Sequence, residues 1–261
     1  MTFQPFVPTG GLAGWRFLQR TVDTQMAAFA RSPLLQRDID DFAARIGGIS
    51  TPDELVSDYR LLSVALGAFG LSDDLPNKHF IKTVLAEGTN DPNALANRLA
   101  DKRYRDLSRA FGFGDLSPPN TALSDFPERI AARYRDHAFE TALGRSDETM
   151  RLALHARREM AVAAEGGASD RTKWFRLMGT PPLRKVLEGA LGLPASFGTL
   201  DLERQLETFR TRVSAQFGVD DFDGLAQPAT LDRLLDRFTA SAGIGSGVAA
   251  TSPALMILRG Y

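Results

Sequence analysis

Three histidines, His79, His137 and His155, are the residues of this chain best suited to proton transfer or metal binding. None of them belongs to an H-E-x-x-H motif or to another spacing that brings two histidines to one metal ion. His155 and Glu159 lie one helical turn apart in "HARRE", but the two arginines between them would repel a cation. We therefore interpret His155 and Glu159 as a surface ion pair and predict no metal site.

Two acidic pairs, Asp73-Asp74 and Asp220-Asp221, are the next candidates, because carboxylates bind calcium and transfer protons. A calcium loop needs oxygen ligands at alternating positions, and neither "SDDLPNK" nor "VDDFDGLAQ" supplies them. The chain has no cysteine, no G-x-S-x-G motif and no Walker A loop. We predict that these aspartates form turns or helix caps, and that the chain has no catalytic residue and no cofactor-binding residue.

The charge balance argues against nucleic acid as a ligand. The chain has 31 Lys+Arg and 32 Asp+Glu, a net charge of -1 and a pI near 6.3, so it lacks the general positive charge that attracts phosphate backbones. No stretch is long and apolar enough to span a membrane. The N-terminus lacks the basic segment and apolar stretch of a cleaved signal peptide, so we expect a cytoplasmic protein, or export without such a signal.

The elements that must position these residues are helical. Apolar residues recur at intervals of three and four along almost the whole chain, which predicts an all-α fold of about ten helices in an irregular bundle of two lobes. The stretch "LSPPNTALSDFP" combines adjacent prolines with turn-forming polar residues. We therefore expect an N-terminal helical lobe over residues 1–115 and a C-terminal helical lobe over 116–240. Residues 241–261, which begin with Gly, Ser and Ala, are predicted to form a flexible tail.

Two stretches, "LLSVALGAFGL" (61–71) and "LRKVLEGALGL" (183–193), share the frame L-x-x-V-x-x-G-A-x-G-L. A helix commonly ends at a glycine in the left-handed conformation, followed by an apolar residue that packs back on the last turn. A phosphate-binding loop would instead place its glycines before a helix. We predict that the frame ends helices, with positive φ at Gly70 and Gly192, and that Gly67 and Gly189 lie at close helix crossings. The predicted helix-ending glycines are Gly70, Gly112, Gly192 and Gly218.

The repeated frame also predicts a partial internal duplication. Thr-Pro pairs at Thr51 and Thr180 read as helix starts, with threonine as the cap and proline in the first helical turn. Residues 51–87 would then match roughly residues 180–209, because both segments begin with a capped start and contain the frame.

One apolar stripe near the N-terminus has the spacing of a helix that packs on another helix. It either packs within its own chain or binds a partner helix. The stripe, which is the candidate partner-binding surface, consists of Leu12, Trp15, Leu18, Val22, Met26 and Phe29. The predicted core contains Trp15, Phe42, Leu62, Phe69, Phe111, Trp174, Val186, Phe209 and Phe217.

Several stretches together carry a family resemblance, among them "GGLAGWRFLQRT" (10–21), "LLSVALGAFGL" (61–71), "NKHFIKTVL" (77–85), "ALANRLADKRY" (94–104), "WFRLMGTPPLRKV" (174–186) and "LGLPASFGTLDLERQL" (191–206). Over about residues 10–240 the chain resembles the alphaproteobacterial family of unknown function numbered 1217. The resemblance implies a role near the flagellum, because members are often encoded beside flagellar genes. It supplies no reaction and no catalytic residues.

We therefore expect a non-catalytic, flagellum-associated structural or assembly protein that binds a protein partner, such as a flagellar component. It would act in the cytoplasm or be exported to the flagellum. The alternative is a small enzyme of unknown class with a cleft between the two lobes, although activity needs convergent titratable groups that the sequence does not show. Nothing in the sequence defines the oligomeric state.

Overall fold

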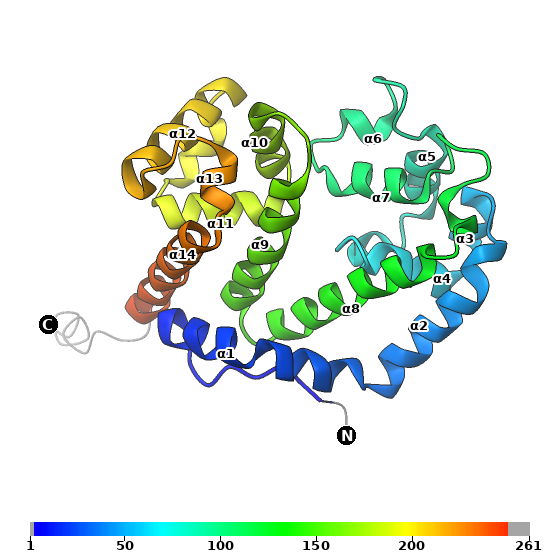
Figure 1. Cartoon of the computed structure of the whole chain (residues 1–261), viewed down its shortest axis with the longest axis horizontal. Helices are drawn as coiled ribbons and strands as arrows, with labels where there is room; N and C mark the ends of the chain where they lie inside the picture. The colour runs from blue at the N-terminus through cyan, green and yellow to red at the C-terminus, as the bar shows by residue number, and fades with distance from the viewer. Residues whose placement is uncertain (1–2, 250–261) are drawn as a thin grey trace, which may run out of the picture. The chain divides into compact units, whose positions relative to one another are not determined.

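The computed structural model describes residues 3–249, and in this range the chain forms fourteen α-helices, four short 3-10 helices and no strand (Figure 1). The predicted all-α fold is confirmed. The number of helices is higher than predicted, because short helices such as α6 (Leu95–Arg98) and α13 (Phe222–Ala226) carry too few residues to show a period.

The chain divides into two compact units. The first contains Asp23–Ala142 together with residues 3–5, and the second contains Phe6–Val22 and the described chain from Leu143 onward. The lobe boundary expected after residue 115 lies inside the first unit. The proline-rich stretch is packed there, because Thr121 is buried and its Oγ1 donates a 2.7 Å hydrogen bond to the Ile49 carbonyl.

The first unit is built around α4, whose residues from Leu61 to Gly67 are almost all buried. The cluster around α4 draws side chains from α2, α3, α5, α7 and α8, including the edge-to-face pair Phe111 and Phe126 with ring centroids 5.1 Å apart. The elements that contribute to this unit are α1 (Gly11–Ala30, C-terminal part), α2 (Pro33–Arg45), η1 (Ile46–Gly48), α3 (Pro52–Ser57), α4 (Tyr59–Gly67), η2 (Ser72–Asp74), α5 (Lys78–Glu87), α6, α7 (Arg103–Phe111), η3 (Asn120–Ala122) and α8 (Phe126–Gly144).

The period of apolar residues after Thr51 predicts one helix to Gly70, and the structure corrects this to two. Asp58 has an extended backbone between α3 and α4, and its Oδ1 accepts hydrogen bonds from the Arg60 and Leu61 amides, both at 3.1 Å. An aspartate that caps a new helix interrupts the old one without disturbing the spacing of apolar residues. Tyr59, which falls on this apolar period at the start of α4, is 62% exposed.

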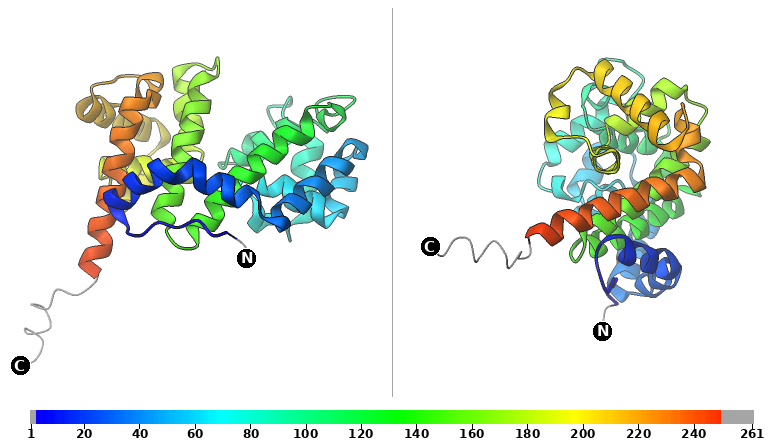
Figure 2. Two further views of the ribbon diagram at one scale, coloured as in Figure 1. Left: turned by 60° about the horizontal axis from the view of Figure 1, so that its bottom comes forward. Right: turned by 90° about the vertical axis from the view of Figure 1, so that its left-hand side faces the viewer.

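In the second unit α11 packs against α9 and α14, α10 packs on α11, and α13 packs on α9 and α14. The start of α1 also belongs to this unit and passes across α14 (Figure 2). There Arg16 pairs with Asp236, and Gln19 Nε2 donates to Asp232 Oδ1 at 3.3 Å. The further elements of this unit are α9 (Glu148–Glu165), α10 (Asp170–Met178), α11 (Pro181–Leu191), η4 (Ala195–Thr199), α12 (Leu202–Phe217), α13 and α14 (Pro228–Ala249).

The predicted tail begins too early. Residues 241–249 continue α14, and Gly243 lies against Gly11, where an added Cβ would be 3.2 Å from the Gly11 Cα. Small residues therefore allow this part of α14 to approach the start of α1 closely. The rest of the predicted tail, residues 250–261, lies outside the described residues.

The predicted core is confirmed. All nine residues, Trp15, Phe42, Leu62, Phe69, Phe111, Trp174, Val186, Phe209 and Phe217, are buried, with at most 6% of the residue exposed. Helical periodicity was sufficient for these nine residues because each lies on the apolar face of an amphipathic helix, and that face packs toward the core.

Candidate functional site

The repeated frame ends its two helices in the same way. Gly70 and Gly192 have φ of +67° and +65°, as predicted. In the first copy the Leu71 amide donates to the Leu66 carbonyl at 2.9 Å, and in the second the Leu193 amide donates to the Glu188 carbonyl at 2.9 Å. These bonds define the Schellman motif, in which the residue after the glycine closes the last turn. The frame is therefore a helix ending in both copies.

Gly112 and Gly218 also end helices with positive φ, but by the simpler motif. The Gly112 amide donates to the Ser108 carbonyl at 2.8 Å, and the Gly218 amide donates to the Ser214 carbonyl at 2.9 Å. A single bond across five residues is the αL ending. Of these four glycines, only Gly70 and Gly192, in the two copies of the frame, end their helices with the Schellman motif.

The inner glycines of the frame lie at close helix crossings, as predicted. A Cβ at Gly67 would be 2.6 Å from Tyr134 Cε2 on α8, and a Cβ at Gly189 would be 2.9 Å from Phe238 Cδ2 on α14. Each glycine thus makes room for an aromatic ring from a later helix of its own unit. This packing offsets the roughly 1 kcal/mol that glycine costs against alanine inside a helix. The sequence did not indicate which aromatic residue would lie there.

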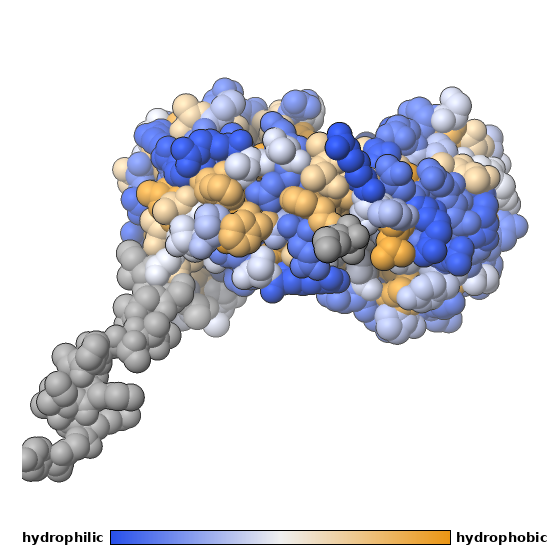
Figure 3. Space-filling view, turned by 90° about the horizontal axis from the view of Figure 1, so that it is seen from below, coloured by the Kyte–Doolittle hydropathy of each residue, from blue (hydrophilic) through white to orange (hydrophobic). Residues whose placement is uncertain are grey.

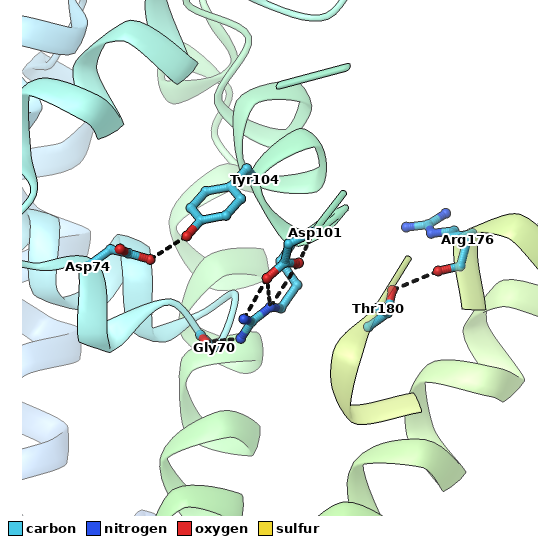
Figure 4. Close-up of polar contacts among 7 residues, drawn as sticks. Gly70, Asp74, Asp101, Tyr104, Arg176 and Thr180 are labelled. Atoms are coloured by element: carbon cyan, nitrogen blue, oxygen red, sulfur yellow. Dashed lines mark hydrogen bonds and ion pairs between the residues drawn. The ribbon is translucent and has the colours of Figure 1, made fainter. Parts of the chain in front are cut away.

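In each copy of the frame an arginine from another segment hydrogen-bonds a backbone carbonyl, that of Gly70 just after α4 and that of Ala190 in the last turn of α11. Arg103 Nη1 donates to the Gly70 carbonyl, and Arg103 is held by Asp101 with an Nη2–Oδ2 distance of 2.7 Å (Figure 4). Arg237 Nε donates to the Ala190 carbonyl at 3.2 Å. Carbonyls at a helix C-terminus have no partner within the helix and carry partial negative charge, so a guanidinium is a favourable partner.

The two Thr-Pro starts are not equivalent. Thr51 forms a full capping box with Glu54, whose pKa is lowered mainly by the backbone N–H groups of Ser50 and Thr51. The Thr180 side chain makes no cap and instead donates to the Arg176 carbonyl at 2.8 Å (Figure 4). Thr180 lies three residues before its copy of the frame, and the residue three before the other copy is Asp58 rather than Thr51. The duplication stays a prediction.

The polar residues near Gly70 form a link between elements. Tyr104 donates its hydroxyl to Asp74 Oδ2 at 2.6 Å, which ties α7 to η2 (Figure 4). Burial, together with this hydrogen bond and the nearby carboxylates, raises the pKa of Tyr104 far above its ordinary value. The phenol therefore stays protonated at neutral pH and acts as a hydrogen-bond donor.

The acidic pairs form turns and caps, as expected. Asp74 also accepts a 2.9 Å hydrogen bond from Asn77 Nδ2 and, with Asp73, belongs to η2. Asp221 caps α13 through its 2.7 Å bond from the Gly224 amide, and Asp220 Oδ1 accepts from Ser214 Oγ at 2.6 Å. Asp74, Asp220 and Asp221 thus accept hydrogen bonds from nearby residues, whereas Asp73 is exposed in η2.

The interpretation of His155 and Glu159 as a surface ion pair is wrong. His155 is only 4% exposed, and Glu159 instead pairs with Arg158 at 3.3 Å. On α8, His137 Nδ1 lies 3.3 Å from Glu140 Oε2, and Glu140 is buried. Spacing along one helix did not reveal these positions, because burial depends on which elements pack over each face. The expectation that the chain binds no metal ion stays a prediction.

The stripe proposed as a partner-binding surface is divided by burial. Trp15 and Leu18 are fully buried, Leu12 is 40% exposed, and Val22, Met26 and Phe29 are half-buried. Phe29 packs edge-to-face on Phe139, with ring centroids 5.6 Å apart. A partner therefore has access to Leu12 and to the half-buried part of the stripe, but not to its centre.

These features define an all-helical protein in which the polar residues selected from the sequence mainly cap helices and link elements. The chain belongs to the family described as Protein of unknown function (DUF1217), whose model matches residues 68–231, more than half of the chain. No curated protein matches.

The fold is also similar to that of a solved structure, an X-ray crystal structure of a protein from Agrobacterium tumefaciens. The TM-score is 0.74 at 22% sequence identity, and the match covers 93% of this chain and 99% of that chain. At this identity the similarity shows a shared fold. Among the described helices, none has the length and apolarity needed to cross a membrane.

Proposed function

We propose that this protein is a non-catalytic, flagellum-associated structural or assembly protein that acts by binding a protein partner. The observation that carries the proposal is membership of the DUF1217 family, together with the flagellar gene context that the sequence resemblance implies. The polar residues that attracted attention in the sequence support it indirectly. Of these, Asp74 accepts the hydrogen bond that links α7 to η2, and Asp221 caps α13.

The exposed apolar residues supply the surface for a partner. On the face that Figure 3 shows, hydrophobic side chains form small groups separated by hydrophilic ones. The large apolar residues with the highest exposure are Phe6, Leu12, Leu34, Tyr59, Leu116, Leu123, Val162, Leu200 and Leu202. In a protein interface, apolar side chains of this kind form the centre and polar residues form the rim. We place the partner surface at the start of α1, where Leu12 continues the stripe.

The test is motility in a strain that normally swims. Deleting the gene is expected to reduce swimming, and a chromosomal Leu12→Asp variant is expected to reduce it without lowering the amount of folded protein. Leu12 is 40% exposed, so a charge there removes an apolar contact without opening the core.

Leu34→Asp is the matched control, because Leu34 is 57% exposed but lies on α2. Normal swimming in the gene deletion would refute the flagellar role. Reduced swimming in the deletion with normal swimming in Leu12→Asp would refute the α1 surface and leave the role in place.

A further inference from the structure

The side of α7 that faces away from the core of the first unit is positively charged. Leu107 and Phe111 lie on the buried side of this helix. Lys102, Arg105 and Arg109 follow one another at intervals of three and four residues, which places them on the opposite side. Arg105 and Arg109 are exposed. Three cations therefore lie along one face of α7.

Two of these cations have no acidic partner. Lys102 Nζ donates to two backbone carbonyls at the end of α6, which lies beside α7 (Figure 1). Within residues 3–249 the side chains of Arg105 and Arg109 form no hydrogen bond and no ion pair. Like charges one helical turn apart destabilise a helix, and Asp106 is the only carboxylate in α7. The fold alone therefore gives no reason for two arginines at these positions.

Two exposed leucines are held at the C-terminal end of α7. Leu116 is 49% exposed and Leu123 is 47% exposed. The Leu116 amide donates to the Gly112 carbonyl at 2.9 Å, and a Cβ at Gly112 would lie 2.9 Å from Leu116 Cδ1. Asn120 Nδ2 donates to a carbonyl in the last turn of α7 at 3.0 Å, and Leu123 follows one turn later. The backbone that bears both leucines is thus fixed to the helix that bears the two arginines.

We propose that these side chains form a docking site for an amphipathic segment of a second protein, which presents carboxylates to the arginines and apolar side chains to the leucines. We call this site the α7 surface, and it consists of Arg105, Arg109, Leu116 and Leu123. A guanidinium binds a carboxylate through two parallel hydrogen bonds. Because the arginines are one helical turn apart, carboxylates with the same spacing on a partner helix match them. Leucines on a fixed backbone lose little entropy when they are covered.

An acidic protein segment fits the α7 surface better than other anions do. The affinity of nucleic acid depends on the number of phosphates that cations neutralise, and two free arginines on a chain of net charge -1 neutralise few. Binding to a membrane surface scales with the buried apolar area, and two leucine side chains supply little. The inference goes beyond the proposed function, because the α7 surface lies in the first unit and depends neither on Leu12 nor on a flagellar role.

The probe is a fluorescein-labelled peptide of sequence ELAEELAEELAE, which as a helix presents glutamates one turn apart beside a stripe of leucines. Fluorescence anisotropy measures its dissociation constant for the full chain. In the double variant Arg105→Glu and Arg109→Glu we expect this constant to rise at least about tenfold, because attraction becomes repulsion. In the double variant Leu116→Ser and Leu123→Ser it should rise at least about threefold, because apolar contact is lost. Added salt should weaken binding to the wild-type chain.

The double variant Arg37→Glu and Arg60→Glu is the matched control for the arginines. Both residues are exposed in the first unit, and this variant changes the net charge by the same amount on α2 and α4. Leu34→Ser is the control for the leucines, because Leu34 is 57% exposed on α2. The dissociation constant of each control should stay within about twofold of the wild-type value, since charges away from the peptide are screened. Circular dichroism should give the same helix content for every variant.

Three results would overturn the inference. The first is no saturable binding of the acidic peptide by the wild-type chain up to about 1 mM. The second is an equal loss of binding in a control and in the variant that it matches. The third is equal binding of the basic peptide KLAKKLAKKLAK. Phosphatidylglycerol vesicles or duplex DNA that bind through the two arginines, without binding of the acidic peptide, would also contradict a protein partner at the α7 surface.

Discussion

Glycine serves two separate purposes within eleven residues of this chain. Gly70 supplies a left-handed backbone at the end of α4, whereas Gly67 supplies space for the Tyr134 ring. The second copy repeats both purposes at Gly192 and Gly189. Because the first effect is conformational and the second steric, substitutions distinguish them.

Gly192 isolates the conformational effect. Nothing lies within 4 Å of an added Cβ at Gly192, so the cost of Gly192→Ala comes from the backbone at φ +65°. We expect the free energy of unfolding to fall by about 1–2 kcal/mol, despite the better helix propensity of alanine. Urea unfolding followed by circular dichroism measures this change.

Gly48→Ala is the control for Gly192→Ala, because it meets equally open space without a positive φ and should be close to neutral. If Gly192→Ala proved as stable as wild type, the left-handed ending of α11 would be contradicted.

Between elements, the segment after α7 holds the loop between α5 and α6 through one carboxylate. Asp115 accepts hydrogen bonds from the Thr89 amide and hydroxyl at 2.8 Å and from the Asn90 amide at 2.9 Å. Gly88 allows this approach with φ +70°. Burial opposes ionisation of Asp115, but these donors outweigh it, so its pKa lies below the ordinary value.

Asp115→Asn is expected to lower the free energy of unfolding at neutral pH by about 1–3 kcal/mol, since the amide accepts fewer and weaker bonds. Because the folded pKa is lowered, the contribution of the carboxylate is complete above the unfolded value of 3.8 and is lost as pH falls through the folded pKa. The stability difference between wild type and variant should therefore shrink below about pH 4.

Urea titrations at several pH values measure this difference. Asp73→Asn is the control, because Asp73 is exposed in η2 and accepts no hydrogen bond within the described residues. A difference between wild type and Asp115→Asn that stays constant down to pH 2 would contradict the assignment of the bonds to the charged carboxylate.

For the whole molecule, charge governs which partners are attracted at long range. Because 31 basic and 32 acidic residues nearly balance, we expect counterion release to contribute little affinity for nonspecific nucleic-acid binding. The partner surface proposed at Leu12 is apolar instead, so contacts there should depend little on ionic strength.

We expect a labelled duplex DNA to bind with a dissociation constant weaker than about 100 µM at physiological salt, measured by fluorescence anisotropy. A basic DNA-binding domain under the same conditions serves as the positive control. Micromolar binding that weakens steeply with added salt would show a clustered positive surface and would contradict this expectation.

The sequence by itself determined the local features of this protein. Helical spacing of apolar residues indicated the all-α fold and the buried helix faces that contain Trp15 and Phe209. Glycine followed by leucine indicated the helix endings at Gly70 and Gly192. These features depend on interactions within one or two helical turns, which neighbouring residues encode directly.

Only the tertiary structure decided which distant segments meet. It brought Tyr134 to Gly67 and Phe238 to Gly189, buried His155, and packed the proline-rich stretch around Thr121 within the first unit. An apolar face specifies that a helix packs, but many partners of similar shape satisfy it. The choice among them depends on how all helices of a unit fill one core at close-packed density, and that choice is a property of the folded chain.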